Sequence, residues 1–291
     1  MPYEYVLGGS EWAATRLRFQ DELTKTNFDG HRLDPSIRVQ HGMRIADVAT
    51  GTGSWACDIA EQYPGVQVEG LDINLSEIPA NGYWPKNLTF TTINLLEDMR
   101  ERLLGRYDIV NVQYIMPIVD DDVFPVILGR LKSLLKPDGY LQWTDSNTNK
   151  WTWFTPTTTV FSARTAHNPD IAPTLTKLLL LAMNIIRVRS KSQDWLNRME
   201  SGFASAGFEN VKQIVPKPKP STVQPLVVNF IWTMDEGFQN ILESKECGDE
   251  MRGWIEEWFE NRKQLIAEVR EQGVGMNTFM TRCVGRKKDG T

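Results

Sequence analysis

Cysteine and histidine are scarce in this 291-residue sequence, which has three of each. The cysteines, Cys57, Cys247 and Cys283, are odd in number and far apart, and none belongs to a CxxC pair. This pattern argues against a disulfide framework, a zinc finger and a thioredoxin-like redox motif. Widely spaced single cysteines are typical of a reducing, intracellular compartment.

The sequence also lacks an excess of positive charge and a long apolar run. Its formal net charge is -5, whereas nucleic-acid binding requires clustered Lys and Arg. The longest apolar stretch, Leu178 to Ile186, is interrupted by Asn184 and is too short to span a bilayer. The N-terminus has neither the basic start nor the apolar stretch of a secretory signal. We therefore expect a soluble cytoplasmic protein with no nucleic-acid or membrane partner.

From Met43 to about residue 150, short apolar strands alternate with helices. This alternation predicts βαβ units and a parallel sheet. Two further strands, at 209–215 and 278–284, complete an α/β fold with a doubly wound, mostly parallel seven-stranded sheet. The first five predicted strands cover residues 44–49, 66–71, 88–93, 109–114 and 139–144, and the helices between them cover residues 54–62, about 97–104 and 123–135.

The rest of the chain is predicted to cover this core, so we expect a single domain over residues 1–291. Residues 1–40 form an N-terminal helical cap, with a helix at 11–25, and residues 41–150 form the core. Residues 151–190 and 221–272 form helical covering segments, and residues 191–220 and 273–288 complete the sheet. The prolines of residues 216–220 cannot continue a central strand, because each lacks a backbone donor.

A glycine-rich turn follows the first predicted strand. The segment Ile45 to Trp55 reads IADVATGTGSW and passes through Gly51 and Gly53 into a helix. Glycines there permit positive φ and let a ligand approach the backbone, at the edge where open α/β sheets bind ligands. The sequence has no GxGxxG and no GK[ST] motif, so a phosphate-cradling version of this turn fits poorly.

An acidic residue, Asp72, closes the second predicted strand 19 positions after Gly53. A carboxylate in this place can accept hydrogen bonds from both hydroxyls of a ribose. An acid at a strand end also serves often as a turn or helix cap. Together with the glycine-rich turn, the position favours the ribose interpretation.

These motifs resemble those of class I S-adenosylmethionine-dependent methyltransferases, and in particular of fungal small-molecule methyltransferases of secondary metabolism. The resemblance covers about residues 5 to 150. The shared pattern consists of Tyr5-Val-Leu7, Glu11, Arg16-Leu17 and Gln20, then ADVATGTGSW from Ala46, GLDI from Gly70, YDIVN from Tyr107 and LLKPDGYLQW from Leu134.

The resemblance implies S-adenosylmethionine as the cofactor. Asp47 and the turn formed by Ala49, Thr50, Gly51 and Gly53 would hold its methionine end. Asp72 would bind its ribose, and Ile73 would lie against one face of its adenine.

Further contacts are implied at the ends of the next strands and in the leading segment. Asn94 and Leu95 would flank the adenine amino group, and Gln113 with Tyr114 would line the floor below the sulfonium. The remaining contacts, from Tyr5 and Arg16, would close over the amino-acid moiety.

Three residues depart from the family pattern. Ala49 stands where the family usually has glycine, which is tolerable if φ there is negative. Asn94 replaces an aspartate, but its side-chain oxygen can still contact an adenine amino group. Asp21 stands where the family often has histidine, which removes a possible cofactor contact.

The resemblance predicts methyl transfer to a small-molecule secondary metabolite, with oxygen as the expected methylated atom. Transfer from a sulfonium depends mainly on alignment, and a general base helps when the acceptor is a hydroxyl. His167 and His31 are the candidate bases. His41 precedes the first strand, on the far side from the ligand, and is set aside.

Other interpretations stay open. Trp151, Trp153 and Phe154 follow the fifth strand and either line an acceptor pocket or pack in the core. The run of residues 120–122, all aspartate, suggests a metal less than it suggests a helix cap, so no metal is expected. Some relatives use the cofactor for pericyclization or dehydration without methyl transfer, and others regulate through complex formation. A homodimer is one assembly that these predictions allow.

Overall fold

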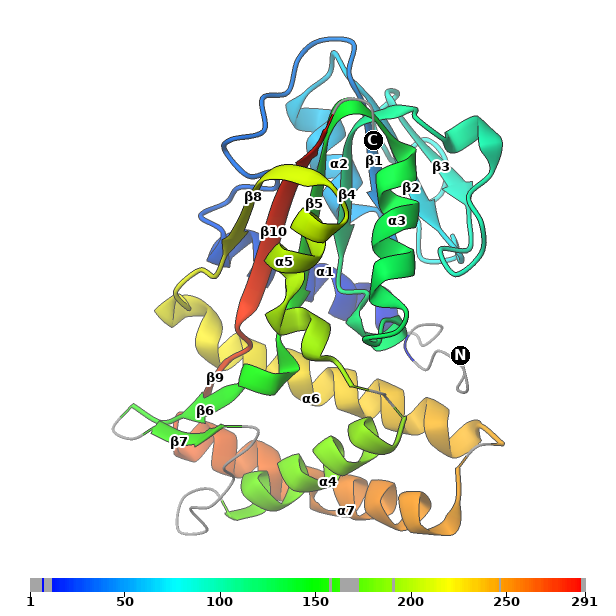
Figure 1. Cartoon of the computed structure of the whole chain (residues 1–291). Helices are drawn as coiled ribbons and strands as arrows, with labels where there is room; N and C mark the ends of the chain where they lie inside the picture. The colour runs from blue at the N-terminus through cyan, green and yellow to red at the C-terminus, as the bar shows by residue number, and fades with distance from the viewer. Residues whose placement is uncertain are drawn as a thin grey trace. The chain divides into compact units, whose positions relative to one another are not determined.

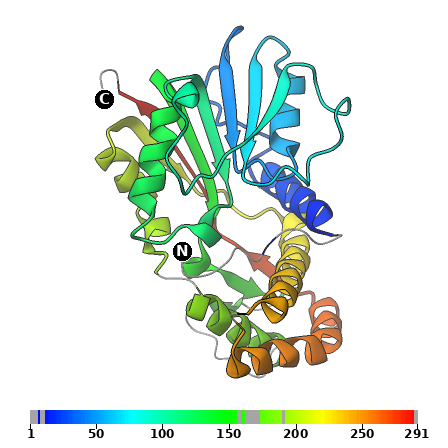
Figure 2. The same ribbon diagram turned by 90° about the vertical axis from the view of Figure 1, so that its right-hand side faces the viewer.

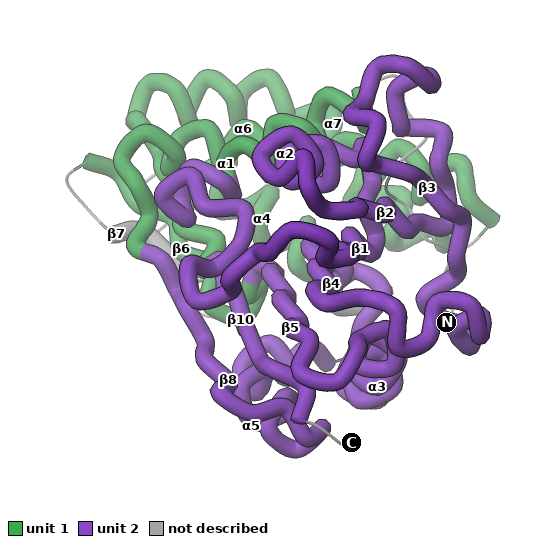
Figure 3. The backbone as a smooth tube through the Cα atoms, turned by 90° about the horizontal axis from the view of Figure 1, so that it is seen from above, with its two compact units in different colours: residues 1–23, 147–191, 217–279 green, residues 24–146, 192–216, 280–291 purple. Residues whose placement is uncertain are grey.

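The structure, a computed structural model, describes Leu7 and residues 12–156, 159–162, 173–189, 192–245 and 247–288. The chain divides into two compact units (Figure 3). Unit 1 consists of residues 1–23, 147–191 and 217–279, and unit 2 consists of residues 24–146, 192–216 and 280–291. The organisation as a single domain over residues 1–291 stays a prediction.

Unit 2 contains a seven-stranded sheet with the order β3-β2-β1-β4-β5-β10-β8 (Figure 1). The first five strands in this order are parallel, and β10 runs antiparallel to both of its neighbours. The predicted α/β class, with a doubly wound, mostly parallel sheet, is confirmed. The strands are β1 (Arg44–Val48), β2 (Gln67–Asp72), β3 (Leu88–Thr92), β4 (Tyr107–Gln113), β5 (Leu135–Ser146), β8 (Phe208–Ile214) and β10 (Met280–Lys287).

Helices cover both faces of this sheet, because successive strand residues point to opposite sides. Ile45 of β1 packs in one apolar cluster with helix α2 (Ser54–Gln62). Its neighbour Ala46 packs in a second cluster with α3 (Phe124–Leu134) and α5 (Met199–Ser205). Figure 3 shows α2 on one side of the sheet, and α3 and α5 on the other. This burial on two faces explains why the central strands are almost continuously apolar.

Two connections in unit 2 bear on the predicted elements. The helix predicted around residues 97–104 is wrong: only a 3₁₀ turn, η1 (Glu101–Leu103), forms there. Leu103 is its one buried side chain, which is too little apolar burial to hold a longer helix among charged residues. Asp120 accepts the backbone N–H groups of Asp122 and Val123 at 2.9 Å each, so the acidic run forms a turn directly before α3.

Unit 1 combines helices with a small antiparallel sheet. The helices α4 (Pro173–Arg189) and α7 (Asp249–Glu271) lie in the segments predicted as helical covering, 151–190 and 221–272. A further helix, α6 (Pro220–Glu243), lies in the segment predicted as helical covering. The sheet has the order β7-β6-β9 and was not predicted; its strands are β6 (Thr152–Phe154), β7 (Thr159–Ser162) and β9 (Gly275–Asn277).

The first helix of the chain, α1 (Ala13–Asn27), confirms the helix predicted at 11–25. The boundary between the two units falls within it, after Leu23. Figure 2 shows α1 in dark blue and α6 in yellow to orange. Among the described residues, no helix has the length and apolar character needed to cross a bilayer.

Candidate functional site

The centre of the unit 2 sheet is a topological switch point. Chain connections run outward from β1 through β2 to β3, and outward from β4 to β5 on the other side. Ligands of open α/β sheets bind in the crevice beyond the carboxyl ends of such strands. Two turns begin at these ends: the β1 turn, which we define as residues 49–53, and the β4 turn, residues 114–116.

The β1 turn is built on left-handed backbone. Ala49, Gly51 and Gly53 have φ values of 55°, 54° and 72°. The condition under which an alanine at position 49 is tolerated without strain, a negative φ, is therefore not met. A residue with a Cβ atom pays roughly 1–2 kcal/mol for this conformation, because Cβ approaches the following carbonyl oxygen. The strain indicates that the turn geometry is imposed by the surrounding structure.

Asp72 holds the β1 turn from the end of the neighbouring strand. Its Oδ2 accepts the backbone N–H of Gly51 at 2.8 Å, and its Oδ1 accepts the N–H of Asn74 at 3.0 Å. Burial raises the pKa of this carboxyl, and hydrogen bonds from backbone amides oppose the increase. The side chain is half-buried, so its oxygens retain lone pairs at an accessible edge. Asp72 therefore presents a partly accessible carboxylate at the carboxyl end of β2, and its contact with a ribose stays a prediction.

Asp47 has a different environment, although it was predicted to hold the methionine end of the cofactor. It is 3% exposed. Its Oδ2 accepts the hydroxyl of Thr50 at 2.6 Å, and its Oδ1 accepts the amide of Asn111 at 2.8 Å. The Asn111 oxygen in turn accepts the amide of Gln142 at 2.9 Å. Asp47 therefore anchors Thr50 through a buried polar network that crosses β1, β4 and β5.

The glycines near this turn are also explained by packing. A Cβ atom on Gly53 would lie 2.8 Å from Cζ of Phe90, and one on Gly70 would lie 2.5 Å from its Cδ1. Gly70 and Phe90 are direct partners in the pairing of β2 with β3. The aromatic ring therefore lies over both glycines. Sequence reasoning assigned Gly53 to ligand approach and missed this second requirement for a small residue.

The residues predicted to contact adenine lie at the ends of β2 and β3. Ile73 is 63% exposed, directly after Asp72. Asn94 forms a local turn, since its Oδ1 accepts the N–H of Leu96 at 3.0 Å and its Nδ2 donates to Glu97 at 2.9 Å. Leu95 is buried in the apolar cluster of α3 and α5. Of these three predicted contacts, only Ile73 presents a largely exposed side chain.

The β4 turn contains the predicted floor residues. Gln113 is the last residue of β4, and Tyr114 follows it with a φ of 55°. The N–H of Tyr114 donates to the carbonyl of Thr144 at 3.0 Å. Its hydroxyl lies 2.6 Å from the hydroxyl of Thr24 in α1. The two strands at the switch point thus both lead into a left-handed residue that is not glycine.

Asp145, near the end of β5, was not predicted as a site residue from the sequence. Its Oδ2 accepts the backbone N–H groups of Ile115 and Met116 at 3.1 Å each and the indole N–H of Trp143 at 3.2 Å. Its Oδ1 accepts the N–H of Ser146 at 3.0 Å. Asp145 is fully buried, and burial raises its pKa to about 7. The available signal was an acid at a strand end, the same signal that Asp72 carries.

Arg16, the contact predicted from the leading segment, belongs to unit 1. Its guanidinium is 3% exposed, and its Nε lies 2.5 Å from a carboxylate oxygen of Glu236 in α6. Gln20 and Thr233 accept from its Nη1 at 3.3 and 3.4 Å. The positive charge of Arg16 is therefore compensated inside unit 1. The predicted contact from Tyr5 lies outside the described residues.

Of the two candidate bases, only His31 belongs to the described residues, and it is not part of either turn. His31 is exposed after α1, and its backbone carbonyl accepts Nη1 of Arg282 at 3.2 Å. His167 lies outside the described residues. In the aromatic stretch after β5, Trp151 and Trp153 are buried and pack edge-on against Phe230, whereas Phe154 is half-buried.

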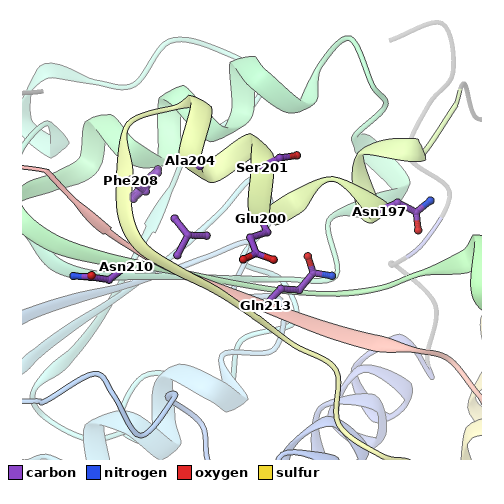
Figure 4. A pocket seen from close by; sticks show the side chains of 8 residues that line it. Asn197, Glu200, Ser201, Ala204, Phe208, Asn210 and Gln213 are labelled. Atoms are coloured by element: carbon purple, nitrogen blue, oxygen red, sulfur yellow. The ribbon is translucent and has the colours of Figure 1, made fainter.

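A surface pocket lies between α5 and the edge strand β8 (Figure 4). Glu200 and Ala204 contribute from α5, and Phe208 and Gln213 from β8. No residue predicted for the cofactor lines it, so this pocket and the switch point are separate features. Within the described ranges, no three His, Cys, Asp or Glu side chains gather closely enough to hold a metal ion.

Comparison with known proteins supports the fold. No family model matches the chain. The solved phosphoethanolamine N-methyltransferase 2 of Haemonchus contortus, in complex with phosphomonomethylethanolamine and S-adenosylhomocysteine, superposes with a TM-score of 0.52 at 14% identity. The superposition covers 99% of this chain and 62% of that protein. This chain has the class I methyltransferase fold.

Sequence comparison extends the resemblance to fungal methyltransferases. The chain is 30% identical to the N-methyltransferase verN of Clonostachys rogersoniana over 139 residues, which cover 47% of this chain and 48% of that protein. It is 31% identical to the methyltransferase grgD of a Penicillium species over 127 residues, 41% of this chain and 42% of that protein. The chain thus matches about half the length of these relatives, and the predicted resemblance is confirmed.

Proposed function

We propose that this class I methyltransferase fold binds S-adenosylmethionine at the switch point and transfers the methyl group to a small-molecule acceptor. One observation carries the proposal: the β1 turn is tied by Gly51 to the carboxylate of Asp72 at 2.8 Å. A glycine-rich turn and a strand-end acid, predicted separately from the sequence, therefore form one structure. The fungal relatives named as methyltransferases support the same function.

The residues present fit this cofactor chemically. Asp72 offers carboxylate lone pairs for ribose hydroxyls at an accessible edge. Ile73, 63% exposed beside it, offers an apolar surface suited to a purine face. Gly51 and Gly53 bring backbone without side chains to the carboxyl end of β1. Gln113 ends β4, the strand that pairs with β1 on its other side, and Tyr114 follows it.

The cofactor supplies an electrophilic methyl group, so the protein contributes mainly alignment. Holding two reactants in attack geometry can supply roughly 7–11 kcal/mol of the barrier. His31 and His167 stay predictions as bases, and oxygen stays the predicted methylated atom. Because the relative verN is named an N-methyltransferase, nitrogen is the alternative that the product must decide.

The test has a binding stage and a turnover stage. Calorimetry of the purified chain with S-adenosylmethionine and with S-adenosylhomocysteine should give saturable binding of both. Incubation with S-adenosylmethionine and a panel of hydroxylated and amino-substituted aromatic metabolites should yield a product heavier by about 14 mass units, the mass of one added CH₂. Product NMR then identifies the methylated atom.

Each stage has an outcome that contradicts the proposal. Absence of binding to both ligands would overturn the cofactor assignment. Binding followed by an isomerised or dehydrated product would favour the pericyclase or dehydratase alternative. Binding without any turnover, together with a tight protein complex, would favour the regulatory alternative. The named relatives do not favour either of these over methyl transfer.

A further inference from the structure

The β4 turn is held more tightly than an ordinary loop. The N–H of Tyr114 donates to Thr144 at 3.0 Å, and the next two amides, of Ile115 and Met116, both donate to one carboxylate oxygen of Asp145 at 3.1 Å. Three successive backbone donors are therefore satisfied by two consecutive residues of β5. The hydroxyl of Tyr114 is also fixed, 2.6 Å from that of Thr24.

These hydrogen bonds surround a strained residue, Tyr114. Tyr114 has a φ of 55°, a conformation that bulky side chains adopt rarely. Such residues persist when the surrounding contacts over-determine them, and they cluster at functional sites. Thr144 and Thr24 contact Tyr114 itself, and the fully buried carboxyl group of Asp145 fixes the two amides that follow it. Asp145 is separated from solvent and cannot touch a ligand itself. Any effect on a ligand would pass through the β4 turn that it fixes, which begins with Tyr114.

We propose that Asp145 is a positioning residue: its carboxyl group fixes the β4 turn, so that Tyr114 favours the methylated sulfonium of the cofactor over the demethylated product. This inference rests on the proposed function, because it places Tyr114 beside the sulfonium. An electron-rich phenol ring attracts a cation. S-adenosylmethionine carries the sulfonium charge and S-adenosylhomocysteine does not, so the ratio of their affinities reports the position of Tyr114.

The first experiment measures the affinities of the full chain for S-adenosylmethionine and S-adenosylhomocysteine by calorimetry. It needs no methyl-accepting substrate. Asp145→Leu removes the acceptor oxygens at similar size, and it should lower the preference for S-adenosylmethionine by about fivefold or more. Asp145→Asn retains one acceptor oxygen for the two amides and should keep the ratio within about twofold of the wild type. Asp72→Asn is the matched control, because it should weaken both ligands alike and leave the ratio unchanged.

A double-mutant cycle tests whether the effect passes through Tyr114. Tyr114→Leu should lower the preference in the same direction as Asp145→Leu, and the two changes together should lower it no further than the larger single change. Independent, multiplying effects would overturn the inference. An unchanged ratio in Asp145→Leu, or an equal loss in Asp145→Asn, would overturn it as well.

A measurement on the wild type covers the case in which Asp145→Leu does not fold. Hydrogen exchange should show the amides of Ile115 and Met116 protected about 100-fold or more beyond that of Asp122. The Asp122 amide also bonds a carboxylate, Asp120 at 2.9 Å, but the residue is exposed. Equal protection of the Ile115, Met116 and Asp122 amides would overturn the inference that Asp145 fixes the β4 turn. Absence of binding to either ligand would instead overturn the proposed function, while the exchange result would still stand.

Discussion

The turns at the carboxyl ends of β1 and β4 have a common construction. Each begins with a left-handed residue that is not glycine, Ala49 in one and Tyr114 in the other, both with a φ of 55°. Each is held by an acid near the end of the next strand outward, Asp72 on β2 and Asp145 on β5. The switch point is therefore flanked by two strained turns and two carboxylates.

The two carboxyl groups differ in how accessible their oxygens are to a ligand. Asp72 is half-buried and accepts one backbone amide on each oxygen. Asp145 is fully buried and accepts four N–H groups from the protein, three of them on one oxygen. The comparison teaches that the same strand-end acid can bind a ligand or can organise the backbone, depending on its exposure and on its internal donors.

The largest effect that separates the two acids is expected in the pH dependence of stability. Burial raises the pKa of Asp145 from its usual 3.8 to about 7. Protonated Asp145 is therefore favoured in the fold, so its contribution to stability is fully present below pH 4 and is lost as the pH rises to about 7. The unfolding free energy of the wild type, relative to Asp145→Asn, should fall by about 4 kcal/mol over this window.

Urea denaturation of both proteins between pH 4 and pH 8 measures this difference. Asp72→Asn provides the comparison, because the pKa of Asp72 is raised in the same direction. Its curve should show the same sign and a smaller amplitude. If the difference between wild type and Asp145→Asn grows with pH, Asp145 is stabilised as a carboxylate and the contrast between the two acids must be redrawn.

The second effect concerns ligand binding. Asp72→Ala should weaken S-adenosylhomocysteine by tenfold or more, about 1.4 kcal/mol, in calorimetry. Asp72→Ala also removes the hydrogen bond to the Gly51 amide, so the loss of affinity does not report the ribose contact alone. A ligand that lacks one ribose hydroxyl tests that contact separately. The 2′-deoxy analogue should bind the wild type about fivefold more weakly than the parent ligand and bind Asp72→Ala as well as the parent does. A variant that still distinguishes the two ligands would show that the ribose lies elsewhere.

The same comparison shows how far sequence reasoning reaches. The parallel sheet was predictable because its strands are apolar, regularly spaced and separated by helices. The place of Asp72 at the sheet edge was predictable because it closes a strand soon after a glycine-rich turn. Asp145 also lies at a strand end, but its role depends on Ile115 and Met116, some thirty positions earlier. Such long-range contacts leave no local pattern in one sequence.

The parts of unit 1 that were missed have a related cause. β6 and β9 are three residues each and lie far apart in the chain, so neither shows a period of its own. β9 is followed closely by β10, but the two belong to different sheets. The change occurs at Phe279, whose φ is 46° and whose N–H donates to Asn277 at 2.9 Å. The pattern over residues 278–284 predicted one strand, because a left-handed phenylalanine is not foreseen from residue type.

The smallest effect expected is on the strain of the β1 turn. Ala49→Gly should stabilise the protein by about 0.5–1 kcal/mol, because glycine adopts a positive φ without the clash of a Cβ atom. Ala56→Gly is the matched control: Ala56 lies within α2, where the same change should destabilise by about 1 kcal/mol. Urea midpoints for the two variants should thus move in opposite directions.

If Ala49→Gly also destabilises, packing of the Ala49 methyl group against the α3 and α5 cluster outweighs the strain. The β1 turn would then be held by its apolar contacts as well as by Asp72, and its likeness to the β4 turn would be limited to the carboxylates.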